Sequence, residues 1–151
     1  MGRWLRKAGH VPDQVLCSSA RRARQTWQLA QPALKAAPPV SFEDRIYLAS
    51  AGQLLDLARQ APRAVQTLLI VGHDPGIPGL ALLLAGPASP TDGGSGIAPP
   101  AAFDRMGAKF PTAAIAVLEL TGIWRQLGPG TAHLVSFVIP RDVRTGKQAG
   151  R

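Results

Sequence analysis

An apolar run that ends in a glycine–histidine pair constrains this fold more than any other stretch. Residues 68–71 read Leu-Leu-Ile-Val, and Gly72-His73-Asp74-Pro75-Gly76 follow directly. Such a run is typical of a strand covered on both faces of a parallel sheet. Asp74 before Pro75 predicts a helix start, with aspartate as the N-cap and proline in the first turn. His73 is therefore expected either as a ligand-binding residue at the carboxyl end of a buried strand, or as a structural histidine there.

A second junction of strand and helix carries positive charge. Residues 14–17 predict a short strand, and Ser18-Ser19 offer an N-cap for a helix over residues 20–33. The first turn of that helix holds three arginines, which oppose the helix dipole. An anion held between free backbone N–H groups and an arginine, typically phosphate, would relieve this conflict. Alternatively, these arginines belong to a generally basic surface. They are Arg21, Arg22 and Arg24.

The remaining pattern alternates strands and helices. Helices are expected to end at Gly9 and to span residues 51–60 and 77–85, and strands are expected at 40–42, 113–120 and 133–139, the last two antiparallel at one edge. This predicts an α/β fold of three layers, α/β/α, with a mostly parallel sheet. We expect one domain over residues 1–140, a flexible insertion at 86–104 and a basic tail at 141–151.

Composition narrows the function classes. The net charge of +8 requires that anionic partners be considered, but the charge is dispersed, so we expect no nucleic-acid partner. The only cysteine, Cys17, excludes an internal disulfide and a cysteine-based metal site, and it fits a reducing cytoplasm. No apolar run is long enough to span a bilayer, and no secretory leader is evident, so a soluble protein without a membrane partner is expected.

Common catalytic motifs are missing from the sequence. It has no dinucleotide-binding glycine motif, Walker loop or serine-nucleophile elbow, and its three scattered histidines make a weak zinc case. The two junctions remain. In a parallel sheet both open on the same edge, so Arg22 and His73 could converge on one anion. A guanidinium that neutralises phosphoryl oxygens beside a histidine suits phosphoryl chemistry.

Four ordered elements resemble the histidine phosphatase superfamily, which has a phosphoglycerate mutase-like fold. Ser18-x-x-x-Arg22-Ala23-x-x-Thr26 looks like its Ser-x-x-x-Arg-Ala-x-x-Thr element, and residues 71–76 are similar to its Val-Gly-His-Asn-Pro-Gly signature. Residues 46–49 and 109–112 resemble two further elements. Together they point to the small SixA-type phosphohistidine phosphatases.

The resemblance implies a nucleophilic histidine in an N-terminal Arg-His-Gly motif, a phosphohistidine intermediate, and a pocket of two arginines and two histidines. By position, Arg22 matches the second phosphate-binding arginine, His73 the second pocket histidine, and Ser18 the serine that opens its motif. Glu43 or Asp44 lies near where many members place an acid, although this branch lacks a consistent one. Neither a metal nor another cofactor is implied.

The sequence departs from this family in one important respect, because it contains no Arg-His-Gly. The family's first, central strand should precede the helix that ends at Gly9. Either the chain is truncated or it is degenerate. We favour truncation, because Arg22 and His73 would otherwise have no obvious role and the neighbouring strands would expose their backbone edges. His10 and His133 are expected to be structural or surface residues rather than substitute nucleophiles.

These expectations predict a phosphohistidine phosphatase that acts on a phosphorylated protein, with little or no turnover from the chain itself. Two alternatives remain within the superfamily: a non-catalytic domain that binds phosphate or a phosphoprotein, and a small-molecule phosphomonoesterase. A basic nucleic-acid-binding module is a third alternative, but it would need exposed stacking aromatics, and two of the three tryptophans lie on expected core faces.

Overall fold

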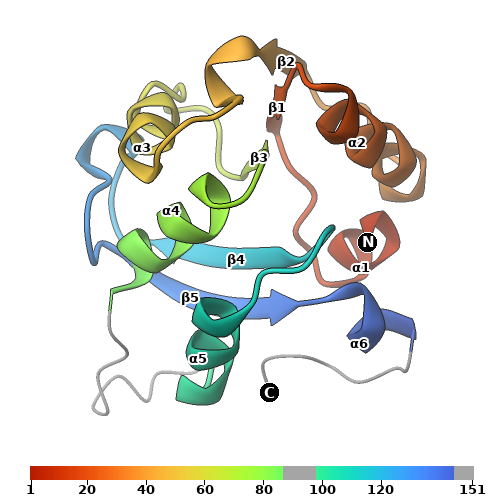
Figure 1. Ribbon diagram of the computed structural model, residues 1–151. Helices are drawn as coiled ribbons and strands as arrows, with labels where there is room; N and C mark the ends of the chain where they lie inside the picture. The colour runs from red at the N-terminus through yellow and green to blue at the C-terminus, as the bar shows by residue number, and fades with distance from the viewer. Residues whose placement is uncertain (87–97, 145–151) are drawn as a thin grey trace.

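Three parallel strands organise the N-terminal half of the protein. The computed structural model describes residues 1–86 and 98–144. Strands β1 (Gln14–Ser18), β2 (Val40–Glu43) and β3 (Leu68–Val71) form a sheet in the order β2-β1-β3 (Figure 1). Val15 in β1 pairs with Val40 on one side and with Leu69 on the other. The two strands that precede the candidate site motifs, β1 and β3, are therefore neighbours.

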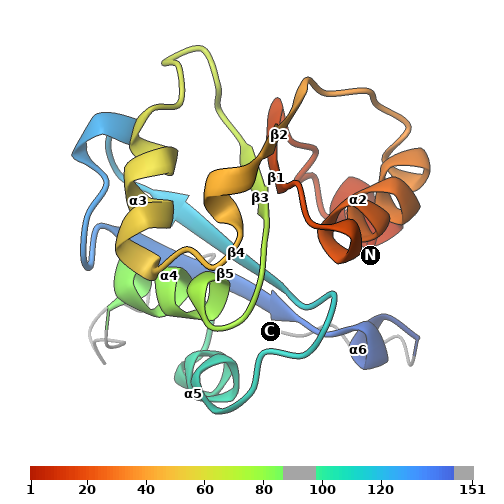
Figure 2. The same cartoon turned by 45° about the horizontal axis from the view of Figure 1, so that its top comes forward.

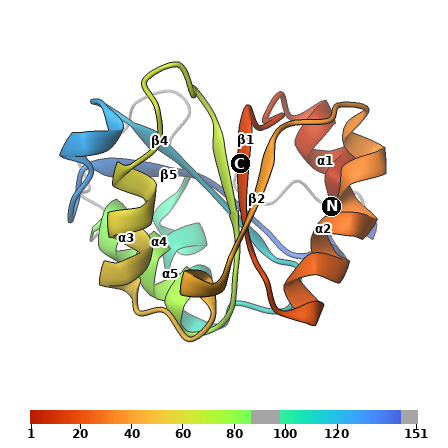
Figure 3. The same ribbon diagram turned by 90° about the horizontal axis from the view of Figure 1, so that it is seen from above.

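Helices cover both faces of this sheet, because successive strand side chains point to opposite faces. Val15 and Cys17 pack under α1 (Gly2–Lys7) and α2 (Arg21–Leu34), with Trp27 of α2 in the same cluster. Leu16 faces the other way, towards α3 (Ala51–Arg59) and α4 (Gly76–Ala85). Figure 3 shows the two helix pairs on opposite sides of the three strands. The α/β class and the three layers expected from the sequence are confirmed.

The C-terminal half forms a second, smaller sheet. Strands β4 (Ile115–Leu120) and β5 (Ala132–Val138) pair antiparallel, with a register shift between Val117 and Leu118. Helix α5 (Pro100–Ala108) lies against β5 (Figure 2), and Met106 and Phe137 are buried between them. Three short helices complete the described residues: η1 (Asp44–Ile46), η2 (Trp124–Gln126) and α6 (Pro140–Arg144).

The two sheets do not join. In the described part of the chain β3 pairs only with β1, and β4 pairs only with β5. All four residues of β3 are only partly buried, whereas Val15 and Cys17 of β1 are fully buried. The prediction that residues 68–71 form a strand is confirmed, and both of its faces are covered: Leu68 and Ile70 pack with one helix pair, and Leu69 and Val71 with the other. The partial exposure of β3 arises at its open edge, which faces β4 across a cavity of about 730 Å³.

Some expected boundaries need correction. Helix α5 begins at Pro100, inside the segment expected as an insertion over residues 86–104, because proline suits a first helical turn and Ala102 and Met106 supply a buried face. Residues 87–97 lie outside the described part. Helix α6 similarly occupies the start of the expected basic tail, where Arg105 forms an ion pair with Asp142. Residues 145–151 also lie outside the description.

The start of α4 also differs from the expectation. The helix begins at Gly76 with Pro75 as its N-cap, and no side chain caps it. Asp74 therefore does not act as the N-cap. The His73 carbonyl accepts the Ile77 N–H at 2.9 Å, so the backbone of the turn supplies that contact instead. None of the helices in the described ranges is long and apolar enough to cross a membrane.

Candidate functional site

A hydrogen bond joins the two strand ends that the sequence singled out. Ser18 is the last residue of β1 and is fully buried, and His73 follows β3 after Gly72. Because β1 and β3 are parallel neighbours, their carboxyl ends lie at the same edge of the sheet. The His73 Nε2 atom lies 2.8 Å from Ser18 Oγ, a hydrogen-bonding distance. The structure thus brings Ser18 and His73 together.

The turn that carries His73 is held in place by tight packing. A Cβ atom added at Gly72 would lie 2.9 Å from the Ile77 side chain and 3.0 Å from that of Ile46. A Cβ at Gly76 would lie 2.4 Å from the Ala49 carbonyl oxygen, which no side-chain movement could relieve. Both glycines are therefore required for the turn to approach the loop after η1, and this close approach fixes the position of His73.

Tyr47, in the same loop, contacts His73 directly. The two rings meet edge to face with their centroids 5.6 Å apart, a geometry typical of favourable aromatic pairs. Tyr47 is more than half exposed. It therefore covers one side of the imidazole while remaining accessible to a ligand. Sequence reasoning noticed residues 46–49 only as a family element and assigned Tyr47 no role.

The start of α2 presents the arginines to solvent. Its N-cap is Ala20 rather than Ser18 or Ser19, and no side chain caps the helix. The Ala20 N–H instead donates to Ser18 Oγ at 3.2 Å, outside the helix. Arg22 is exposed, and its guanidinium makes no hydrogen bond or ion pair to any described side chain. With no acidic residue in this turn, the charge of Arg22 remains available to an anion.

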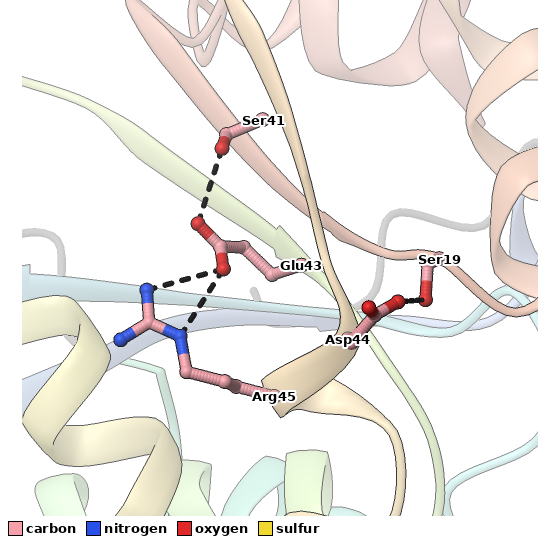
Figure 4. Close-up of polar contacts among 5 residues, drawn as sticks. All are labelled: Ser19, Ser41, Glu43, Asp44 and Arg45. Carbon is pink, nitrogen blue, oxygen red and sulfur yellow. Dashed lines mark hydrogen bonds and ion pairs between the residues drawn. The ribbon is translucent and has the colours of Figure 1, made fainter.

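The two candidate acids point to opposite sides of the end of β2, as Figure 4 shows. The carboxylate of Glu43 accepts from Ser41 at 3.1 Å and from two nitrogens of Arg45. Asp44 instead accepts a hydrogen bond from the hydroxyl of Ser19, which follows Ser18. Glu43 is therefore engaged by Ser41 and Arg45, whereas Asp44 contacts Ser19, the neighbour of Ser18 in the chain. Sequence reasoning left these two open and missed the role of Ser19.

Cys17 lies immediately before Ser18 but does not offer a thiolate. Burial raises the pKa of its thiol from the ordinary 9.0 to about 11, and the positive charge of Arg24 offsets only part of this effect. The thiol is therefore protonated at neutral pH. Because the thiolate is the nucleophilic form, Cys17 is not a nucleophile of this site.

The other histidines lie elsewhere. The His10 ring packs 5.9 Å from that of Trp4, in the loop that enters the amino end of β1. His133 lies in β5, opposite Glu119. In residues 1–86 and 98–144, no group of three or more His, Cys, Asp or Glu side chains is placed to hold a metal ion.

Comparisons with known proteins identify the family. No family model matches the chain. An uncharacterised protein of Mycobacterium tuberculosis strain H37Rv is 41% identical over 140 residues, which cover 93% of this chain and 81% of the relative. An uncharacterised protein of Mycobacterium leprae is 37% identical over 140 residues, 79% of its length.

Solved structures match over nearly the same range. A protein of Nakamurella multipartitia assigned as a phosphohistidine phosphatase SixA is 31% identical, with a TM-score of 0.71, and the match covers 92% of this chain and 77% of that one. This chain belongs to the SixA family. The corresponding assigned SixA protein of Agrobacterium tumefaciens has 25% identity and a TM-score of 0.67, over 92% and 75% of the two chains. A SixA structure with bound tungstate, at 19% identity and a TM-score of 0.65, shares the fold.

The SixA resemblance rested on four ordered elements, from which Ser18, Arg22 and His73 were matched by position to pocket residues. The structure links Ser18 to His73 directly and places Arg22 in the turn that begins three residues after Ser18. The hydrogen bond from Ser18 to His73 therefore links the end of β1 to the turn after β3.

Proposed function

We propose that the protein is a phosphohistidine phosphatase whose described residues form the phosphoryl-binding part of the active site. The hydrogen bond between Ser18 and His73, at the sheet edge where α2 begins, carries this proposal. It fixes an imidazole at the strand end that leads into α2, whose first turn has no side-chain cap and carries Arg22. This combination suits a tetrahedral dianion.

In this proposal each residue has a separate task. Arg22 neutralises the oxygens of the transferring phosphoryl group, and His73 donates a hydrogen bond to them while Ser18 holds its ring in place. The P–N bond of the substrate phosphohistidine breaks as a histidine nucleophile takes the phosphoryl group, and water then hydrolyses that second phosphohistidine. The nucleophile belongs to the Arg-His-Gly motif that the family implies and that this sequence lacks.

The 151-residue chain is accordingly proposed to bind phosphate without turning over substrate. The proposed substrate is a phosphohistidine on a protein. The proposed compartment is the cytoplasm, because a reducing environment suits the unpaired Cys17. The names of the SixA structures support a phosphohistidine substrate.

The test is a titration of the chain with tungstate, in which calorimetry measures the binding affinity. Arg22→Ala should weaken binding about 10-fold or more, because a charge-assisted hydrogen bond contributes roughly 1.5–3 kcal/mol. Arg125→Ala, which removes another exposed arginine, from η2, should change the affinity less than about two-fold. Equal effects of both variants would mean that only net charge matters, and the site proposal would fail.

Turnover separates the proposed enzyme from its alternatives. The in-frame reading of the coding DNA upstream of residue 1 should encode Arg-His-Gly, and the extended protein should release phosphate from a phosphohistidine peptide. Saturable binding without turnover by the extended protein would instead establish a phosphoprotein-binding domain. Faster release from small phosphomonoesters than from the peptide would establish a phosphomonoesterase.

A further inference from the structure

A second cavity adjoins His73 through the side chain of Tyr47. The two rings meet edge to face, with their centroids 5.6 Å apart. Tyr47 also lines a cavity of about 420 Å³ between its own loop and α3. The short helix η1, which leads into this loop, packs beside α3 (Figure 2). We call the cavity the Tyr47 pocket, and its other lining residues are Arg45, Leu48, Gln53, Asp56, Leu57 and Gln60.

The charges at the Tyr47 pocket compensate one another. Arg45 pairs with Glu43 at 3.1 Å, and Asp56 pairs with Arg59, also at 3.1 Å. Neither Arg45 nor Asp56 is therefore an isolated charge that would select an ion of the opposite sign. The pocket does not have the character of a second phosphate site, and an uncharged group is the better occupant.

Neutral polar groups and apolar surface make up the rest of the lining. Gln53 and Gln60 are exposed, at the start and at the C-cap of α3, and a side-chain amide both donates and accepts hydrogen bonds. A peptide backbone offers one donor and one acceptor per residue, so these amides beside Leu48 and Leu57 suit a segment of polypeptide. The cavity volume lies within the roughly 300–1,000 Å³ of typical ligand sites, so the pocket can hold more than a phosphoryl group.

Leu48 is held outward at the rim of the Tyr47 pocket. It is 82% exposed, and its φ of 58° lies in the left-handed region, which is unfavourable for a residue with a Cβ atom. Hydrogen bonds on both sides maintain this turn, because the Tyr47 N–H donates to the Asp44 carbonyl and the Ala49 N–H to the Ile46 carbonyl. An exposed leucine alone is ordinary. One that is fixed in an unfavourable backbone conformation beside a cavity is typical of a ligand-binding loop.

We propose that the Tyr47 pocket binds the polypeptide next to the phosphohistidine, an inference that rests on the proposed function. With the phosphoryl group held by Arg22 and His73, Tyr47 is the side chain that connects the phosphoryl site to the pocket. Residues that flank the phosphohistidine place backbone amides against the two glutamines and an apolar side chain against the two leucines. A phosphorylated small molecule leaves the pocket empty, so the pocket selects phosphorylated polypeptides.

Calorimetry on the 151-residue chain tests the proposal with three ligands. They are tungstate, a capped non-hydrolysable phosphohistidine analogue without flanking residues, and a short peptide that carries the same analogue between alanine and leucine residues. The peptide should bind at least about 10-fold more tightly than the capped analogue, because only the peptide buries apolar surface in the pocket.

The variant that separates the pocket from the phosphoryl site is Leu48→Ala. It should weaken peptide binding at least about 5-fold and change tungstate affinity less than about two-fold, because it removes apolar contact area only. Leu29→Ala is the matched control, because Leu29 is also 82% exposed but lies on α2. It should change neither affinity. In addition, NMR should show that the backbone amides of Leu48 and Gln60 shift on addition of the peptide and not on addition of tungstate.

Three results would overturn the proposal: a peptide that binds no more tightly than the capped analogue, equal effects of Leu48→Ala and Leu29→Ala, or unshifted amides at Leu48 and Gln60. Tungstate binding that depends on Arg22 would still support the proposed function in each case. Conversely, peptide binding that depends on Leu48 but not on Arg22 would support the pocket and contradict the proposed phosphoryl site.

Discussion

At the scale of single residues, Ser18 does more than open a sequence motif. Its buried hydroxyl contacts both the His73 ring and the Ala20 N–H. One hydroxyl thereby fixes the histidine and the entry to α2. Losing it leaves two partly buried polar groups, the His73 ring nitrogen and the Ala20 N–H, without this partner, and such a loss costs more than the net value of the hydrogen bonds themselves.

We therefore expect Ser18→Ala to lower the free energy of unfolding by roughly 1–3 kcal/mol and to weaken tungstate binding. Urea unfolding and calorimetry measure the two effects. Ser41→Ala, which removes a hydroxyl bonded only to Glu43, is the control and should leave tungstate affinity unchanged. A Ser18→Ala protein with unaltered affinity would show that Ser18 does not position His73 for the anion.

The raised pKa of Cys17 predicts how stability depends on pH. Its pKa is about 11 in the folded chain and 9.0 ordinarily, so the unfolded state loses the thiol proton first as pH rises. This contribution to stability is complete below pH 9 and declines as the pH rises towards 11. Iodoacetamide should accordingly react with native Cys17 far more slowly than with an added surface thiol, Ala101→Cys. Comparable rates at neutral pH would contradict the buried, protonated thiol.

At the scale of elements, the turn between β3 and α4 depends on glycine at two positions. Gly76 approaches the Ala49 carbonyl, and Gly72 packs against Ile77 and Ile46. The loop after η1 therefore packs closely against the turn and fixes its shape, and Tyr47 from that loop contacts His73. The shape of the site follows from packing between two loops as much as from the strands that precede them.

Gly76→Ala should destabilise the protein by more than about 1–3 kcal/mol, the usual cost of overpacking, because the new methyl group would meet backbone. Gly79→Ala is the matched control in the same helix, since its added Cβ would lie 3.4 Å from Ala51 Cβ and alanine favours helix by roughly 0.5–1 kcal/mol. Thermal unfolding compares the two. Similar melting temperatures for both variants would refute the close approach at Gly76.

At the scale of the whole molecule, the protein is divided into a three-stranded and a two-stranded sheet with an apolar groove between them. The partial exposure of every residue in β3 reflects this division. The residues that the sequence marks as core are thus present, but part of their surface faces the cavity between β3 and β4 rather than protein.

The 151-residue chain should therefore bind the dye ANS under native conditions, as accessible apolar surface does. Dye fluorescence titrated against the protein measures this. The control is the same titration in saturating tungstate: the proposed phosphate site lies outside the cavity, so the fluorescence should be retained. Fluorescence no higher than that of the dye in buffer would contradict an open apolar cavity.

The sequence by itself determined the elements and the edge at which the candidate site lies. The spacing of apolar residues and the positions of proline and glycine influence the backbone only nearby in the chain. The strands at residues 14–18 and 68–71 and the helix over residues 21–34 were therefore predicted within a residue or two. The place of His73 at a strand end followed from the same local patterns, whereas Ser18 was singled out by the family resemblance. Whether Arg22 contacts phosphate stays a prediction, because neither the fold nor the comparisons test it.

Only the tertiary structure decided the contacts between segments distant in the chain. The Ser18–His73 bond spans 55 positions, and the different partners of Glu43 and Asp44 are specified by no local pattern. Helix α5 was missed because its alanine- and proline-rich sequence resembles a linker until Met106 is packed against Phe137. The partial exposure of β3 was also hidden, since an apolar run has the same sequence whether or not a neighbouring strand covers its edge.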